Sequence, residues 1–290
     1  MFTLKRWFDT GMEIYELSEP QGTMARIVPA RGGIVAEFAC WGVPVFYLNQ
    51  ATLRDQSKNI RGGNPVLFPI CGPLEEGKYT LPEGRVYAMK QHGLARNMCW
   101  RVGEVNCGQE SSRITLEACS DEETKEAYPF DFRLVFTYIV ELGRLSIEQT
   151  YYNESEEQMP FYAGFHPYFF APGEKALSLD IPSREYYDLK SGETKPFKGS
   201  LDLNSRPETN LVFSDLSGHE TGFDRLDGWR ITVKFDDNFR HIVLWALKDK
   251  EFLCLEPWMG NNYDLNRGQA RAIPPGQSLA ASVSYCMDKI

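Results

Sequence analysis

Residues Phe132 to Thr150 read FRLVFTYIVELGRLSIEQT, and this stretch decides the fold class. Its first part alternates in polarity, and the bulky apolar side chains that share one face are Phe132, Leu134, Phe136 and Tyr138. The short segment Glu141–Arg144 contains a glycine and predicts a turn. A period of two then resumes from Leu145. Alternation on both sides of a short turn indicates a long antiparallel hairpin.

The same period of two recurs along the chain. Further strands are expected at residues 113–118, 229–236, 241–247, 251–255 and 278–286. Helical periodicity is nearly absent, and the best helix candidate is a turn or two at residues 121–128. Many short strands separated by turns predict an all-β protein, either a sandwich or a barrel.

Composition restricts the class of partner. The chain has 290 residues, of which 42% are hydrophobic, and no shift in composition marks a linker, so we expect one domain over residues 1–290. The net charge is −9 and the basic residues are scattered. Nucleic-acid binders need basic patches, and anionic membranes repel an acidic surface, so neither is an expected partner. The expected partner is a small molecule.

Cysteine usage and the N-terminus bear on location. The cysteines are odd in number and form no C-x-x-C pair: Cys40, Cys71, Cys99, Cys107, Cys119, Cys254 and Cys286. Their apolar surroundings predict buried, reduced thiols. Neither a secretory signal nor a stretch of about 18 apolar residues is present, so we expect a cytoplasmic protein.

Four segments do not follow strand alternation. In residues 60–72, Arg61 lies among glycines and prolines. Residues 91–97 and 164–169 contain His92 and His166, and in residues 254–258 Glu256 precedes Trp258, which is expected to be exposed. Each is weak alone. A histidine in an apolar setting is more often a hydrogen-bonded core residue, and a glutamate at a strand end is usually solvated. The four segments gain meaning only together.

Together these segments resemble the aldose 1-epimerase (galactose mutarotase-like) superfamily. The resemblance rests on the order His92, His166, Glu256 and on the motifs H-P-Y-F at residues 166–169 and L-E-P-W at residues 255–258. It implies a large twisted antiparallel β-sandwich, with Glu256 as catalytic base and His166 as catalytic acid. It further implies that His92 and Arg61 contact the sugar and that Trp258 lines the site.

The motifs combine features of two subgroups. Arg61-Gly62-Gly63 and the segment 92–96, which ends in Arg96, resemble hexose-6-phosphate mutarotases, in which two arginines face the phosphate. The H-P-Y-F and E-P-W motifs resemble the subgroup that acts on unphosphorylated sugars. Family members also often carry an aspartate that holds a sugar hydroxyl. The candidates for that position are Asp215, Asp224, Thr209 and Asn210.

The chemistry explains why these residue types suffice. Ring opening removes a proton from the anomeric hydroxyl and delivers one to the ring oxygen, and a carboxylate and an imidazolium on opposite sides can do both. Rotation about C1–C2 and reclosure then give the other anomer. This reaction requires no metal or cofactor, and Trp258 and Phe165 are expected to stack on the sugar. The protein is expected to act as a monomer or homodimer.

Three other functions were weighed. The first is a non-catalytic carbohydrate-binding or regulatory protein, which retention of His92, His166 and Glu256 disfavours. The second is a zinc enzyme with those three residues as ligands, which lacks support from H-x-H or H-E-x-x-H spacing. The third is a glycosidase, which requires two facing carboxylates where only Glu256 is well placed.

Overall fold

The computed structural model describes residues 1–173 and 176–290 and is dominated by antiparallel sheets. The largest has nine strands, in the order β19 (Ser200–Asp202), β16 (Ala176–Asp180), β21 (Glu220–Asp224), β22 (Trp229–Phe235), β26 (Ser278–Lys289), β12 (Arg144–Asn153), β11 (Phe132–Glu141), β10 (Ser111–Cys119) and β9 (Arg101–Cys107).

A second sheet of eight strands carries the candidate site. Its order is β18 (Glu193–Pro196), β17 (Glu185–Asp188), β20 (Glu208–Phe213), β23 (His241–Leu247), β24 (Phe252–Trp258), β14 (Gly164–Phe165) and β6 (Val66–Leu67), with β15 (Tyr168–Phe170) also paired to β24.

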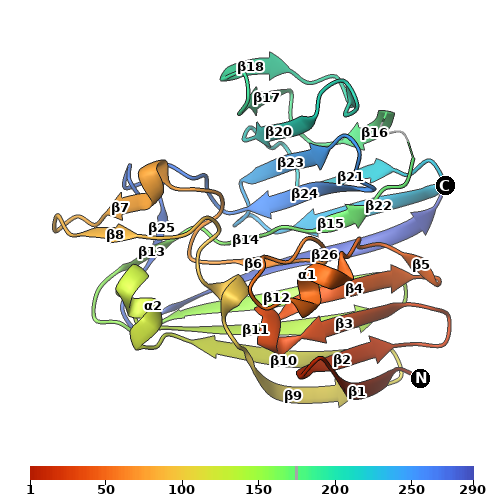
Figure 1. Ribbon diagram of the computed structural model, residues 1–290, viewed down its shortest axis with the longest axis horizontal. Helices are drawn as coiled ribbons and strands as arrows, with labels where there is room; N and C mark the ends of the chain where they lie inside the picture. Colours follow the sequence, from red (N-terminus) through yellow and green to blue (C-terminus); the bar gives the residue numbers. More distant parts are fainter. Residues whose placement is uncertain (174–175) are drawn as a thin grey trace.

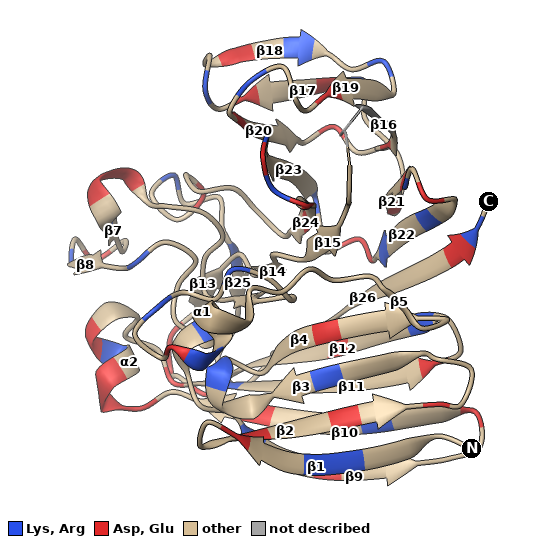
Figure 2. Ribbon diagram, turned by 45° about the vertical axis from the view of Figure 1, so that its right-hand side comes forward, with Lys and Arg blue, Asp and Glu red and all other residues tan. Residues whose placement is uncertain are grey.

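A third sheet has five strands: β1 (Thr3–Asp9), β2 (Met12–Ser18), β3 (Met24–Val28), β4 (Ile34–Cys40) and β5 (Val43–Pro44). Both ribbon views place β1–β4 directly over β9–β12, which makes this part of the molecule a two-layered sandwich (Figures 1 and 2). The hydrophobic core lies between the layers and contains residues from both, such as Leu17 and Phe136.

The remaining elements are short. Two sheets of two strands pair β7 (Lys78–Thr80) with β8 (Val86–Ala88) and β13 (Met159–Phe161) with β25 (Arg271–Ile273). The helical turns are α1 (Gln50–Arg54), α2 (Glu122–Ala127) and the 3₁₀ segments Pro29–Arg31, Glu75–Gly77 and Ala95–Asn97. Within the described ranges, no helix is long and apolar enough to cross a membrane. Lys and Arg are spread over many elements (Figure 2).

The hairpin predicted from the deciding stretch is confirmed. β11 and β12 pair without interruption from Phe132 opposite Asn153 to Glu141 opposite Arg144. The side chains predicted to share one face are fully buried, and Phe136 packs edge-on against Trp100 at 5.0 Å. The all-β class and the remaining expected strands are also confirmed.

The two α-helical turns begin at recognisable caps. α2 was expected, and it begins with a reciprocal capping box in which the Asp121 carboxylate accepts from the Thr124 amide at 2.8 Å while the Thr124 hydroxyl accepts from the Asp121 amide at 2.7 Å. α1 was not expected. Its signal is Asn49, whose side chain accepts from the amide of Thr52.

β24 places the candidate catalytic residues opposite each other. All seven of its residues are buried. β14 pairs with it at Gly164 opposite Trp258, and β15 pairs with it at Tyr168 opposite Cys254. His166 lies midway between these two pairings, so the sheet register brings it opposite Glu256.

Gly164 allows this close approach. A Cβ atom built there would lie 2.7 Å from the Pro257 carbonyl oxygen, 2.8 Å from Cys71 Sγ and 2.9 Å from Trp258 Cδ1. Contacts below 3.0 Å force neighbouring atoms to move. The absence of a side chain at Gly164 therefore lets β14, which leads into His166, pack against β24.

We predict that Gly164→Ala lowers the free energy of unfolding by about 1–3 kcal/mol, the usual effect of overpacking a dense interior. The matched control is Gly218→Ala, where the nearest atom to the new Cβ lies 3.5 Å away. Denaturant unfolding of both variants measures the difference. Equal stability of the two variants would show that β14 and β24 can separate without cost.

Candidate active site

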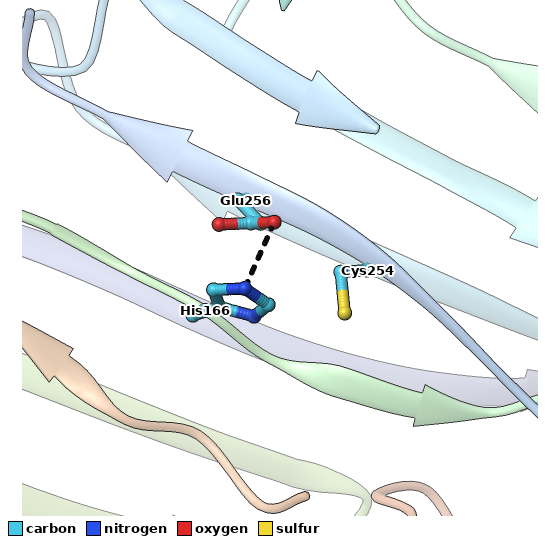
Figure 3. Close-up of side chains that lie close together, drawn as sticks. All are labelled: His166, Cys254 and Glu256. Atoms are coloured by element: carbon cyan, nitrogen blue, oxygen red, sulfur yellow. Dashed lines mark ion pairs between the residues drawn. The ribbon is translucent and has the colours of Figure 1, made fainter. Parts of the chain in front are cut away.

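His166 and Glu256 form a close buried pair. His166 Nε2 lies 3.4 Å from Glu256 Oε1, and the two side chains are 12% and 2% exposed (Figure 3). The other carboxylate oxygen, Oε2, accepts a hydrogen bond of 3.1 Å from the indole N–H of Trp258. Trp258 thus fixes the carboxylate and leaves Oε1 directed at the imidazole.

Burial moves the pKa values of the two groups towards each other's range. Desolvation raises the pKa of Glu256 well above its usual value, partly opposed by the Trp258 hydrogen bond. Desolvation, together with the smaller effect of the charges of Arg96 and Arg61, lowers the pKa of His166 to about 3. Both shifts favour the uncharged forms, a protonated Glu256 beside a neutral His166, over the charged pair.

His92 lies against this pair as a neutral hydrogen-bond donor. Its ring packs edge-on to His166 at 5.3 Å and to Trp258 at 6.0 Å. Burial, followed by the charges of His166, Arg96 and Arg61, lowers the pKa of His92 well below its usual value. Its Nδ1 accepts from the amide of Gly72 at 3.1 Å, so the ring proton is on Nε2.

Two arginines come together beside the histidines. Arg96 is partly buried, and its Nη2 donates to the Gln91 carbonyl at 2.8 Å while its Nε is buried without a partner. Burial lowers the pKa of Arg96, and the charge of Arg61 adds to this effect. Arg61 also hydrogen-bonds the Tyr168 hydroxyl. Among the described residues, neither guanidinium forms an ion pair with a carboxylate.

A buried arginine holds the segment that presents Arg61. Arg31 donates to the carbonyl oxygens of Leu53 at 2.9 Å and Lys58 at 2.8 Å. The backbone of Arg61 is then tied to the same segment, because its amide donates to the Thr52 hydroxyl at 2.9 Å. These bonds position Arg61 although its own side chain is exposed.

Three further residues share this part of the sheet with His166 and Glu256. The sequence assigned no role to Tyr168 and Trp245, and it gave Asn210 only as one of several candidates. Tyr168 stacks on His166 with ring centroids 4.8 Å apart, and Trp245 packs edge-on to His166 at 5.7 Å. Trp245 is paired with Cys254 on one side and Asn210 on the other, so Asn210 shares the sheet face of Glu256. The Asn210 Oδ1 atom is buried without a partner. Strand register, rather than any motif, identifies Trp245 and Asn210.

Trp258 and Phe165 differ from expectation. Trp258 was taken for an exposed residue, but it is 5% exposed because β24 continues through it, and its indole N–H is engaged by Glu256. Phe165 is fully buried and packs against Phe136 at 6.2 Å. Phe165 therefore belongs to the core, and its expected stacking on a sugar is wrong.

The aspartate candidates lie in other settings. Asp215 is exposed and accepts hydrogen bonds from the Ser183 hydroxyl and the Arg184 amide. Asp224 forms an ion pair with Arg230 at 2.8 Å. The role assigned to Asp215 stays a prediction, while Asn210 is the candidate that shares the sheet face of Glu256.

The cysteines divide into two groups. Cys40, Cys71, Cys254 and Cys286 are buried, as expected, whereas Cys99, Cys107 and Cys119 are exposed. Cys254 lies beside the catalytic pair, and its Sγ, one His166 nitrogen and one Glu256 oxygen lie within 4.8 Å of one another (Figure 3). This is the one set of three possible metal ligands found among the described residues, and it does not include His92.

The comparisons with known proteins agree with this fold. The family model described as Aldose 1-epimerase matches residues 13–286, so the chain belongs to the aldose 1-epimerase family. It is accordingly an isomerase of the mutarotase class.

Several similar proteins are known. The Slr1438 protein of Synechocystis sp. PCC 6803 has 37% identity and a TM-score of 0.92 over 96% of both chains. A galactose mutarotase-like protein of Clostridium acetobutylicum shares the fold, with a TM-score of 0.83 and 19% identity over 100% of this chain and 99% of that one. The chromosomal LacX protein of Lactococcus lactis is 28% identical over 233 residues, 71% of this chain and 77% of that protein.

We predict that the His166 imidazole stays neutral as the pH falls and protonates only near pH 3, its lowered pKa. Because His166 has its ordinary pKa of 6.5 when unfolded, its contribution to folding is lost as the pH falls from 6.5 to about 3. Imidazole ¹⁵N shifts measured by NMR against pH test this, with the signal assigned from a His166→Asn spectrum. A midpoint between pH 6 and 7 would contradict it.

Proposed function

We propose that Glu256 is the general base and His166 the general acid of an aldose 1-epimerase reaction on a hexose. The observation that carries the assignment is the buried pair at 3.4 Å, in which burial lowers the pKa of His166 and raises that of Glu256. An acid and a base that face each other inside one site are what simultaneous proton removal and delivery require.

Proton transfer to and from the sugar uses one proton on this pair. With the proton on His166, the Glu256 carboxylate takes the hydrogen of the anomeric hydroxyl while His166 gives its proton to the ring oxygen, and the C1–ring oxygen bond breaks. The pair becomes neutral and the sugar becomes an open aldehyde. After rotation about C1–C2, the reverse transfers close the other anomer. Burial destabilises the charged pair, so it favours the opening step.

The neighbouring residues hold the sugar. The neutral His92 carries its ring proton on Nε2, because its Nδ1 accepts from the Gly72 amide. Nε2 lies 3.1 Å from the Gln91 side-chain amide, and a sugar oxygen would take the place of that contact. The Asn210 Oδ1, buried without a partner, can accept from a sugar hydroxyl and so takes the place of the aspartate sought in the sequence. The Trp258 indole keeps its hydrogen bond to Glu256 when the sugar binds, so its role is to orient the carboxylate.

We predict that Glu256→Gln and His166→Asn each lower kcat by about 10²–10⁴-fold, the usual contribution of one proton-transfer group. Both replacements keep size and polarity, so the fold should persist. Saturation-transfer NMR on glucose, galactose and glucose 6-phosphate measures anomer exchange, with Glu251→Gln on an exposed turn as control. Full activity in either variant would remove that residue from its role. Sugar binding without exchange by the wild type would indicate a binding protein instead.

The two arginines favour a hexose 6-phosphate as substrate. Arg61 and Arg96 carry positive charges that no described carboxylate pairs, beside both histidines. A phosphate monoester carries about −1.5 to −2 charges at pH 7 and accepts several hydrogen bonds, which suits two guanidinium groups. The buried, unpartnered Nε of Arg96 is a donor that such a group can satisfy.

We predict that Arg96→Ala and Arg61→Ala lower kcat/KM for glucose 6-phosphate by about 10–100-fold, since one charge-assisted hydrogen bond contributes about 1.5–3 kcal/mol. The kcat/KM for glucose should change far less. Arg101→Ala removes an exposed arginine paired with Glu117 and serves as control. An equal loss on both sugars would assign the arginines to hydroxyl contacts or to structure.

We further propose one domain over residues 1–290, acting in the cytoplasm as a monomer or homodimer. One hydrophobic cluster that includes residues from Phe2 to Met287 supports the single domain. The net charge of −9 argues against nucleic acid and anionic membranes as partners.

A further inference from the structure

We propose that His166, Cys254 and Glu256 form an inhibitory site for a thiolate-preferring divalent cation such as Zn²⁺. The binding site stands on the geometry of these side chains, and its inhibitory effect rests on the proposed function. The metal would occupy the acid and the base at once, and Cys254, which has no part in the proton transfers, would supply the third ligand.

The strand geometry brings the three donors together. Cys254 and Glu256 are two residues apart on β24, so both side chains lie on the same face. His166 lies in the segment between β14 and β15, both of which pair with β24. One donor atom from each residue lies within 4.8 Å of the others, a spacing that needs only small side-chain rotations to bind one ion (Figure 3).

The donor types select the metal. An imidazole nitrogen, a thiolate sulfur and a carboxylate oxygen are the ligands of Zn²⁺, and three protein ligands leave a fourth position for water. Hard ions such as Mg²⁺ and Ca²⁺ prefer oxygen ligands and fit this set poorly. Because Trp258 holds Oε2 of Glu256, the carboxylate would bind through Oε1 alone.

Charge balance makes the buried complex favourable. The balance starts from a Cys254 thiol and one proton on the pair formed by Glu256 and His166. Binding forms Zn–S, Zn–N and Zn–O bonds and releases these two protons to solvent. One thiolate and one carboxylate then neutralise the two charges of the cation, so the complex carries no net charge into a poorly solvated interior. The nearby Arg61 and Arg96 repel a free cation but not a neutral complex.

The test compares wild type, Cys254→Ser and Cys254→Ala in a background where the exposed Cys99, Cys107 and Cys119 are serine. The matched control is Cys40→Ser, which removes a buried thiol outside the cluster. Chelator-treated protein is assayed for anomer exchange at increasing Zn²⁺, and bound Co²⁺ is followed by its absorption spectrum. Thermal unfolding verifies that each variant is folded.

We expect Zn²⁺ to inhibit wild type and Cys40→Ser, with reversal by chelator. Cys254→Ser and Cys254→Ala should keep their metal-free rate and need at least about tenfold more Zn²⁺ for the same inhibition, because even supporting contacts change metal affinity 10–100-fold. A thiolate-to-cobalt band should appear only where Cys254 is present. Equal inhibition of all variants, or no such band in wild type, would overturn the site.

The two proposals fail in distinguishable ways. If metal-free wild type exchanges no anomers, the proposed function fails, while a cobalt band that requires Cys254 still establishes the metal site. If exchange is fast and Zn²⁺ has no effect, the metal site fails and the acid–base assignment stands.

Discussion

The burial of two facing titratable side chains is the constraint on which the site depends. His166 and Glu256 lie 3.4 Å apart with little exposure, where each charged form alone is costly. Burial lowers the pKa of the histidine to about 3 and raises that of the glutamate well above its usual value, so the usual order of their proton affinities is reversed. The charged pair is therefore the less stable form, and the pair loses its charge when His166 gives a proton to a sugar and Glu256 takes one from it.

The surrounding sheet serves to keep that pair in place. β24 is buried along its whole length, and β14 and β15 fix His166 opposite Glu256 by backbone pairing rather than by side-chain contacts. Gly164 permits the close packing of the strands, and Trp258 holds the outer carboxylate oxygen. A rigid β-sheet supports such a pair more accurately than a loop.

The sequence predicted the parts of the fold that local pattern encodes. The alternation in Phe132–Thr150 predicted the β11–β12 hairpin, and the motifs around His166 and Glu256 predicted the members of the site. It could not predict features that depend on pairing between distant strands. The burial of Trp258, the position of Asn210 beside Trp245, and the approach of Cys254 to His166 all follow from register, which no single segment specifies.

The positive charge of the site means that a phosphorylated substrate would change the pKa of the acid that acts on it. With the pair uncharged, Arg61 and Arg96 leave an excess of positive charge in a protein whose net charge is −9. These two charges also help to lower the pKa of His166. A bound phosphate would neutralise them, and the pKa of His166 would then rise towards the protonated form that the acid requires. On the proposed function, a phosphorylated hexose would therefore bind tightly and also favour the charged pair that opens its ring, whereas an unphosphorylated sugar would leave His166 in its neutral form.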